Sequence, residues 1–182
     1  MIDSSFYAAP WFFKVLEPID DKSILYAFHM YEPYALVNRK NKDVHKYPGI
    51  IPTGETDAKN RKWNKISMSE FLEPIRSFQK KYDIPSNRIV AAEFGIPRKK
   101  VSALAYLRDQ IEIYQKEGWH WAFYSFREDD WDAMDYELGT KPAGMKYWEA
   151  VENGKLPPDS VYARKSKIWE MLKYKISGNQ KR

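Results

Sequence analysis

A carboxylate, a histidine and a tyrosine stand at the ends of two short apolar runs, and these residue types can together perform nucleophilic chemistry. The run over residues 88–92 ends on Glu93, and the run over residues 24–28 is followed by His29 and Tyr31. Hydrogen bonds from a phenol and an imidazole keep the pKa of a carboxylate low and fix its rotamer. We therefore interpret Glu93 as a candidate nucleophile, with a structural salt bridge or a cap as the alternative use of the same residues.

The order of the predicted elements explains how these polar groups come together. Apolar runs over residues 24–28, 88–92 and 119–126 lack helical spacing, which is typical of buried strands. Amphipathic segments over residues 67–82 and 101–118 separate them, and this alternation predicts parallel strands with right-handed crossovers. The carboxyl ends of parallel strands share one edge of the sheet, where ligands bind in α/β folds. A charged residue is therefore expected at the mouth of the sheet rather than inside it.

Local signals mark the remaining elements. Ser67 and Glu70 have the spacing of a capping box, so a helix is expected to begin at Ser67, whereas residues 33–63 are predicted to form one long loop. Further helices are predicted over residues 145–151 and 163–175, the second of them basic. The chain is therefore expected to alternate strands with helices and to close on a basic helix.

The bulk composition indicates a globular protein and excludes several kinds of site. The chain has 182 residues, of which 43% are hydrophobic and 16% aromatic, so a sizeable core or a ring-lined cleft is expected. The absence of cysteine excludes disulfides and thiolate chemistry. His45 and His120 lack the spacing of metal ligands and are interpreted as structural. The sequence therefore predicts neither a metal nor a cofactor.

Charge and hydropathy argue against nucleic acid and membrane as partners. The net charge is +5, but the cations are interspersed with 25 acidic residues, so a basic nucleic-acid-binding domain is the weakest functional interpretation. No run approaches the roughly eighteen apolar residues of a membrane span. The N-terminal stretch "MIDSSFYAAPWFF" lacks the features of a signal peptide. These patterns do not assign the protein to a cellular compartment.

Three stretches of the sequence also resemble a known family. "FHMYEPY", "AAEFG" and "GWHWAFYSFREDDWDAMDYELG" together look like the C-terminal half of a glycoside hydrolase family 5 (cellulase-like) catalytic domain, in register from about Ile2 to about Trp148. The resemblance implies an α/β fold, the C-terminal half of a TIM (β/α)8 barrel with about four parallel strands and flanking helices. It also implies retaining hydrolysis of the β-glycosidic bonds of a glucan-like polysaccharide or oligosaccharide.

The resemblance gives individual residues a role. Glu93 matches the family's catalytic nucleophile at the end of strand seven, and His29 and Tyr31 match the pair that ends strand six, with the tyrosine hydrogen-bonded to the nucleophile. A sugar-stacking ring is expected from strand eight, and a further one where strand five opens. The substrate-binding candidates that join His29 and Tyr31 are therefore Tyr7, Trp121, Tyr124, Phe126 and Trp131.

The second catalytic carboxyl of the family has no counterpart in this chain. That residue is a glutamate in an Asn-Glu-Pro motif on strand four, and retaining cleavage needs two carboxyls about 5 Å apart. Glu32, in "YEP", belongs by register to strand six, and the acidic loop over residues 128–130 is expected to be solvated. The rival interpretation is therefore a catalytically inactive half-barrel that binds sugar or self-associates.

Half a barrel also has two open edges. We predict that residues 1–152 form the partial barrel, strands five to eight, and that residues 153–182 form a basic linker and helix. Closed barrels have no unpaired edge, whereas four strands leave two. The expected partners are therefore a carbohydrate substrate and either a second copy of the chain or a separate N-terminal half-barrel.

Overall fold

The fold is built on a sheet of four parallel strands, seen in a computed structural model. It describes residues 1–38, 40, 43–53, 59–126, 134–139, 143–155 and 166–178. The strands are β1 (Ile2–Asp3), β2 (Tyr26–Met30), β5 (Ile89–Phe94) and β6 (His120–Trp121), in the order β1–β2–β5–β6. All three neighbouring pairs are parallel, which confirms the predicted α/β class.

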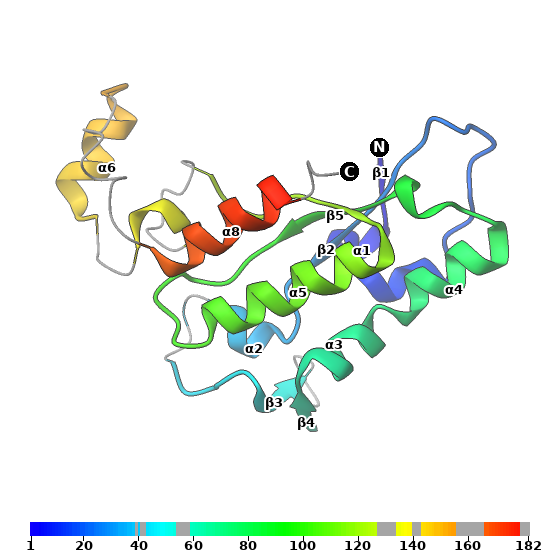
Figure 1. The fold of residues 1–182 in the computed structure, drawn as a ribbon, viewed down its shortest axis with the longest axis horizontal. Coiled ribbons are helices and arrows are strands. Elements are labelled where there is room, and N and C mark those ends of the chain that lie inside the picture. The colour runs from blue at the N-terminus through cyan, green and yellow to red at the C-terminus, as the bar shows by residue number, and fades with distance from the viewer. Residues whose placement is uncertain are drawn as a thin grey trace.

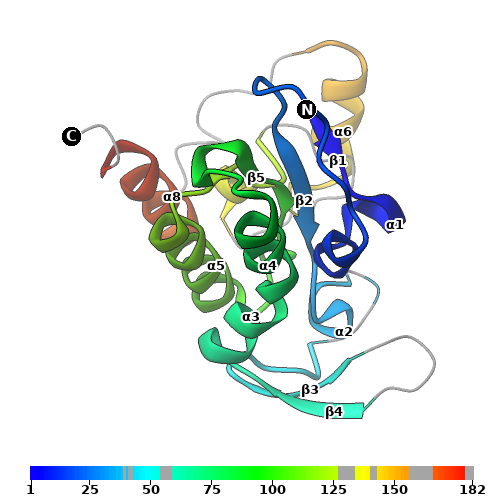
Figure 2. The same ribbon diagram turned by 90° about the vertical axis from the view of Figure 1, so that its right-hand side faces the viewer.

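A layer of helices covers one side of this sheet. It contains α3 (Lys65–Phe71), α4 (Glu73–Tyr82), α5 (Ala103–Glu117) and α8 (Lys167–Gly178), which Figure 2 shows together on the same side of β2 and β5. The rings of Phe28 and Phe94 lie 5.7 and 5.2 Å from that of Tyr114 on α5. Because these rings are almost completely buried, they anchor the sheet to the helix layer.

An irregular register between β2 and β5 decides which way Glu93 points. Phe28 pairs with Ala91 but His29 pairs with Glu93, so Ala92 is an extra residue in β5. In a regular strand Glu93 would share the face of Ala91, which the helices cover, because side chains alternate. The extra residue moves Glu93 to the opposite face, beside His29, as bulges do next to functional sites.

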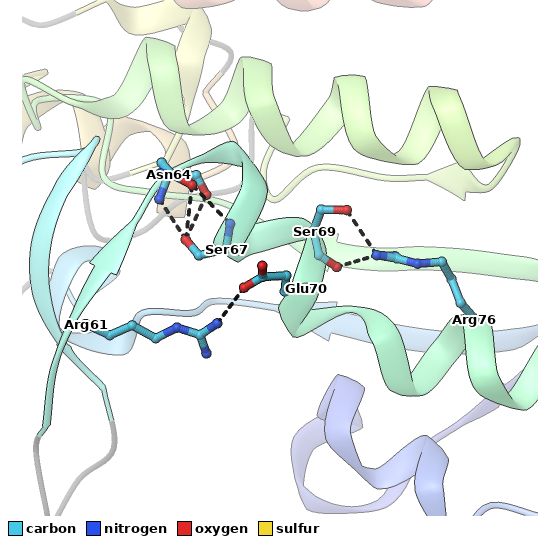
Figure 3. A network of polar contacts seen from close by, with 6 residues as sticks. All are labelled: Arg61, Asn64, Ser67, Ser69, Glu70 and Arg76. Carbon is cyan, nitrogen blue, oxygen red and sulfur yellow. Dashed lines mark hydrogen bonds and ion pairs between the residues drawn. The ribbon is translucent and has the colours of Figure 1, made fainter.

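The first long helix begins earlier than the sequence predicts. Asn64, rather than Ser67, is its N-cap: Asn64 Oδ1 accepts the Ser67 N–H at 3.0 Å, and Ser67 Oγ accepts the Asn64 N–H at 2.8 Å (Figure 3). The Glu70 side chain, expected to complete the capping box, forms an ion pair of 3.0 Å with Arg61 on the neighbouring strand instead. Asparagine caps as well as serine does, so the alternative start satisfies the same backbone donors.

The predicted single helix over residues 67–82 is two helices, α3 and α4, which meet at Leu72. Pro74 occupies the first turn of α4, where its missing N–H costs nothing but prevents a continuous hydrogen-bond ladder. Across the break, Arg76 donates to the backbone and side-chain oxygens of Ser69 (Figure 3). The kink is therefore held by a specific side chain.

The prediction of one unstructured loop over residues 33–63 is wrong. This segment contains the short helix α2 (Tyr34–Val37) and an antiparallel hairpin of β3 (Gly49–Thr53) and β4 (Lys59–Trp63). Ile51 and Trp63 of the hairpin are buried in the core. The hairpin therefore forms part of the main packing unit, which its polar composition did not indicate.

Other boundaries agree with the sequence in part. Gly118, with a positive φ of 72°, ends α5 as predicted. The strand expected over residues 119–126 is regular only in β6, although the Ala122 and Tyr124 N–H groups still bond to Ala91 and Phe94. The remaining helical elements are α1 (Ser5–Ala8), η1 (Pro10–Lys14), η2 (Ser86–Arg88), η3 (Tyr136–Leu138) and α6 (Met145–Glu152).

The C-terminal helices differ in how they pack. Helix α6, predicted over residues 145–151, lies at the opposite end of the long axis from α4 (Figure 1). Helix α8 lies against α5, and Ser166 Oγ caps its start by accepting the Trp169 N–H at 3.2 Å. The predicted basic helix over residues 163–175 is described from residue 166 onward. Within the described ranges, no helix is long and apolar enough to cross a membrane.

Candidate active site

Glu93 is held by two side chains at the end of β2. Tyr31 Oη donates a hydrogen bond of 2.6 Å to Glu93 Oε1, and His29 Nδ1 lies 3.1 Å from Glu93 Oε2. The Glu93 side chain is 34% exposed, so it is neither buried in the core nor free in solvent. Both carboxylate oxygens therefore have a partner, and the rotamer of Glu93 is fixed at the carboxyl edge of the sheet.

Tyr31 is a permanent donor in this arrangement. Its burial, followed by its hydrogen bond to the Glu93 carboxylate, raises the pKa of Tyr31 well above the usual value for tyrosine. The phenol therefore stays protonated over the whole range in which proteins normally fold. A protonated phenol donates to a carboxylate, so this contact holds Glu93 Oε1 in one orientation, as a nucleophile requires.

Two side chains of helix α5 hold the backbone at the end of β2 by hydrogen bonds. Gln110 Nε2 donates to the Met30 carbonyl at 3.1 Å, and Tyr106 Oη donates to the Glu32 carbonyl at 2.7 Å. Gln110 Nε2 also lies 3.2 Å from Tyr106 Oη, which joins the two contacts. The sequence analysis did not select Tyr106 or Gln110, although a glutamine on the apolar face of a predicted helix is a signal that could have found this support.

A glycine lets the segment after β5 approach the segment after β6 just beyond the site. A Cβ atom on Gly95 would lie 2.6 Å from the Tyr124 carbonyl oxygen and 2.9 Å from Met134 Sδ, both shorter than real contacts. Tyr124 lies near enough to Tyr31 to contribute, weakly, to its raised pKa. Of the predicted strand-eight residues, Tyr124 is therefore the one that the structure brings toward the Glu93 site.

A cavity of about 650 Å³ opens beside His29 and Tyr31. Its wall includes Tyr7, a predicted substrate-binding residue. Four further rings line it that the sequence analysis did not select, because they follow the strands in loops and short helices: Phe6, Trp11, Tyr34 and Phe71. The site therefore combines a held carboxylate with an aromatic wall.

Glu32 also lines this cavity, next to Tyr31 in the chain. Its Oε2 accepts the backbone N–H of Tyr34 at 3.1 Å. A hydrogen bond of this kind favours the ionised carboxylate over the protonated acid. Glu32 therefore lines the same cavity as Tyr31 and has one carboxylate oxygen bonded to the backbone.

Two predicted substrate-binding rings lie elsewhere. Trp121 and Phe126 line a second cavity of about 430 Å³ between β6 and α8, and Phe126 stacks on Trp169 with ring centres 5.7 Å apart. His120, interpreted as structural, lies in the same wall with Nε2 3.1 Å from the Asn87 carbonyl oxygen. These rings do not line the cavity beside His29 and Tyr31, so their role in sugar binding stays a prediction.

Some predicted residues cannot be placed. Trp131 and the acidic residues over 128–130 lie outside the described residues. In the part of the chain that the structure describes, no group of three or more histidine or acidic side chains could hold a metal ion. The described site therefore consists of Glu93, its two partners and the adjoining aromatic cavity.

Comparison with known proteins identifies the architecture. No family profile matches the sequence, and no curated protein matches it. A solved endoglucanase has a similar structure, with a TM-score of 0.52 and 20% identity over 72% of this chain and 43% of that one. Thermotoga maritima Cel5A, solved in complex with cellobiose, is similar with a TM-score of 0.54 and 17% identity over 80% of this chain and 45% of its own. The fold is part of a TIM barrel.

This partial barrel spans less than half the length of the two enzymes it resembles. Its four parallel strands and outer helix layer are what such a fragment of a closed barrel contains. In TIM barrels, residues at the carboxyl ends of the strands form the active site. Glu93, His29 and Tyr31 occupy those positions in the partial barrel.

Proposed function

We propose that this chain is the nucleophile-bearing part of a retaining glycoside hydrolase that acts on the β-glycosidic bonds of a glucan-like saccharide. The observation that carries the proposal is the contact of both Glu93 carboxylate oxygens with Tyr31 and His29, at the carboxyl edge of a partial barrel. The similarity to solved endoglucanases supports the substrate class, because their folds are alike. The resemblance of the "FHMYEPY" and "AAEFG" stretches to glycoside hydrolase family 5 points the same way.

In the proposed reaction, Glu93 attacks the anomeric carbon of a bound sugar. The new bond joins a carboxylate oxygen to that carbon, while the bond to the leaving oxygen breaks and its electron pair stays with that oxygen. Water then hydrolyses the glycosyl ester and releases Glu93. The Tyr31 phenol and His29 orient the carboxylate before the attack and limit its rotation, so that less ordering is needed in the transition state.

The leaving oxygen needs a proton, so the reaction requires a second group that donates one. Retaining enzymes take the proton from a second carboxyl about 5 Å from the first. Because Glu32 belongs by register to strand six, whereas the proton donor of the family lies on strand four, we propose that the donor comes from outside these four strands. A second copy of the chain or a separate N-terminal half-barrel could supply it while pairing with the open edges of the sheet.

The proposal is tested with a substrate that needs no proton donor. An aryl β-glycoside with a good leaving group departs without protonation, so an isolated nucleophile is sufficient to cleave it. A 2-deoxy-2-fluoro glycoside of the same kind should leave a covalent sugar on Glu93, detected by intact mass spectrometry and peptide mapping. Glu93→Gln should abolish both cleavage and labelling. Equal cleavage by the wild type and this variant would exclude Glu93 as the nucleophile.

The inactive half-barrel is the second candidate, and it is favoured by the edge strands β1 and β6, neither of which has an outer partner among the described residues. In this case the protein would bind saccharides or self-associate without turnover. Sedimentation velocity combined with calorimetric titration of cello-oligosaccharides separates the two functions. Binding or dimer formation with no labelling of Glu93 would support the inactive form.

A further inference from the structure

Tyr31, which donates to Glu93, lies just beyond the part of β2 that the sheet supports. The last residue of β2 that pairs with β5 is Met30, opposite Phe94. Tyr31 nevertheless makes a hydrogen bond of 2.6 Å to Glu93 Oε1. Because the regular hydrogen bonds of the sheet end before Tyr31, the position of its phenol depends on other contacts of the backbone around it.

Two side chains of α5 bind the backbone on both sides of Tyr31. The carbonyl of Met30, directly before Tyr31, accepts from Gln110 Nε2 at 3.1 Å, and the carbonyl of Glu32, directly after it, accepts from Tyr106 Oη at 2.7 Å. Tyr106 and Gln110 lie one turn apart on the helix, and both are 0% exposed. Both carbonyls that flank Tyr31 are therefore bound to one buried helix face.

The hydrogen bonds of this pair allow only one arrangement. The Gln110 amide has two hydrogens, of which one goes to the Met30 carbonyl and the other to Tyr106 Oη, 3.2 Å away. Burial raises the pKa of Tyr106, so its hydroxyl keeps the proton that it donates to the Glu32 carbonyl. A reversed amide would direct Gln110 Oε1 at another acceptor. We call Tyr106 and Gln110 the α5 clamp.

Core packing alone does not explain a glutamine in the α5 clamp. Gln110 Oε1 is buried and has no hydrogen-bond partner among the described residues. An unpaired acceptor in the interior destabilises a protein, and an apolar side chain of similar size would avoid this loss. Residues that break such a rule occur mainly at functional sites. The presence of Gln110 is therefore better explained by the backbone that its amide holds.

The tyrosine of the α5 clamp is itself held by contacts that do not involve Tyr31. The ring of Tyr106 meets that of Tyr47 edge to face, with centres 5.5 Å apart. Tyr47 in turn donates from Oη to Asp109 Oδ2 at 2.9 Å and from its N–H to Ser102 Oγ at 2.7 Å. Because Tyr47 is bound at both its ring and its backbone, it fixes the direction from which the Tyr106 hydroxyl approaches its acceptor.

We propose that Tyr106 and Gln110 are positioning residues for the nucleophile. By holding the carbonyls on both sides of Tyr31, they keep its phenol at Glu93 Oε1 in the orientation that the attack requires. The inference rests on the proposed function, since the rate depends on this orientation only if Glu93 is the nucleophile. A misplacement of about 1 Å in a reacting group can lower a rate by roughly 10²-fold, so a remote clamp can control turnover.

Two variants remove the polar groups of the α5 clamp and nearly keep its volume. Tyr106→Phe removes the hydroxyl that binds the Glu32 carbonyl, and Gln110→Met removes the amide that binds the Met30 carbonyl. Each should lower kcat on an activated aryl β-glycoside by roughly tenfold or more, with KM within about threefold. Because Gln110 also donates to Tyr106, the double variant should be little slower than the slower single variant.

A second measurement follows Tyr31 without any turnover. In protein labelled with ¹³C at the tyrosine Cζ, the NMR signal of Tyr31 is assigned by its loss in Tyr31→Phe. Both clamp variants should shift this signal, because Cζ reports the hydrogen bond of its own phenol. Tyr114→Phe is the matched control: Tyr114 is also buried on α5, but its Oη has no hydrogen-bond partner among the described residues. It should change neither the Tyr31 signal nor kcat.

Several outcomes would overturn the positioning role. An unchanged Tyr31 signal in both clamp variants would do so, as would an equal loss of kcat in Tyr114→Phe. Failure of both clamp variants to fold, measured by circular dichroism, would assign the hydrogen bonds to stability alone. If the Tyr31 signal shifts but the wild type neither cleaves a glycoside nor becomes labelled at Glu93, the proposed function fails and the positioning of Tyr31 stands. Cleavage and labelling at the same rate in the wild type and both clamp variants are the reverse result.

Discussion

Two cavities of this protein are lined by aromatic rings, and only one of them has the groups that chemistry requires. The wall of the first cavity includes His29 and Tyr31, which contact the two oxygens of the Glu93 carboxylate. The cavity between β6 and α8 has Trp121 and Phe126, but its polar member His120 bonds to a backbone carbonyl. Rings alone therefore do not identify a saccharide site, because they serve equally well in packing against a neighbouring element.

The difference follows from the positions of the cavities on the sheet. The first lies at the carboxyl ends of β1 and β2, beside the place where His29 and Tyr31 contact Glu93 of β5. The second lies along β6, an edge strand among the described residues, and Ile176 of α8 forms part of its wall. An apolar groove beside an unpaired strand is what a sheet with a missing neighbour presents.

The largest expected effect contrasts the two cavities directly. Glu93→Gln should lower kcat on an activated aryl β-glycoside by roughly 10³-fold or more, because it removes the nucleophile. Trp121→Ala should leave kcat/KM within about threefold, since its ring lies in the other cavity. Steady-state kinetics of both variants check the contrast, and a comparable loss in Trp121→Ala would show that the cavities act as one site.

A second prediction concerns the place where β5 approaches the segment after β6. Gly95→Ala should lower the free energy of unfolding by about 1–3 kcal/mol, because its Cβ would overlap the Tyr124 carbonyl oxygen. Urea denaturation measures the change. Gly178→Ala is the matched control, since a Cβ there meets no atom within 4 Å. Equal stabilities of the two variants would mean that the strands can separate without cost.

A third prediction concerns Tyr31, in the wall of the first cavity, and the dependence of protein stability on pH. The pKa of Tyr31 is raised in the folded protein, while an unfolded tyrosine titrates near 10, at about its usual value. Above that pH the unfolded state loses a proton that the folded state keeps, so stability falls as the pH rises, by at most about 1.4 kcal/mol per pH unit for this residue. Below it Tyr31 contributes no slope.

Unfolding in urea at several pH values above 10 measures this dependence. Tyr31→Phe should make the decline less steep, because it removes one titrating group. Tyr174→Phe is the control: this tyrosine is 72% exposed and should leave the slope as it is in the wild type. An unchanged slope in Tyr31→Phe would contradict the raised pKa.

The smallest expected effect concerns the second cavity. Phe126→Ala should cost about 1 kcal/mol of stability or less, because the ring is 54% exposed and packs mainly on Trp169. It should leave cellotetraose affinity unchanged. Thermal unfolding and calorimetry test both statements, and a tenfold loss of affinity would return Phe126 to the substrate-binding residues.

The sequence allowed the site to be predicted where the signal is local. Glu93, His29 and Tyr31 each end an apolar run, so their convergence follows from the parallel arrangement of the strands. The extra residue Ala92 could not be predicted, because a bulge depends on the pairing partner rather than on local pattern. The sequence therefore predicted that these residues share one edge of the sheet, but not the register of β2 and β5 that brings Glu93 beside His29.

Elements that depend on tertiary contacts were missed for the same reason. The β3–β4 hairpin looks polar and loop-like, yet Trp63 packs in the core. Asn64 competes with Ser67 as a cap, and only the fold decides between two residues of similar propensity. Trp11 and Tyr34 lie far from Glu93 in the sequence, so no spacing rule connects them to it.

The extra residue in β5 also has a consequence for how the chain assembles. If β2 and β5 paired without it, Glu93 would face the helix layer and its carboxylate would be forced against Phe28 and Tyr114, while Phe94 would turn to the opposite face of the sheet. Burying an unpaired charge in such surroundings costs several kcal/mol, on the order of the stability of a whole domain. The side chain that we propose as the nucleophile therefore destabilises the pairing of β2 and β5 that lacks the extra residue. The same residue thus serves both the proposed reaction and the correct pairing of the strands.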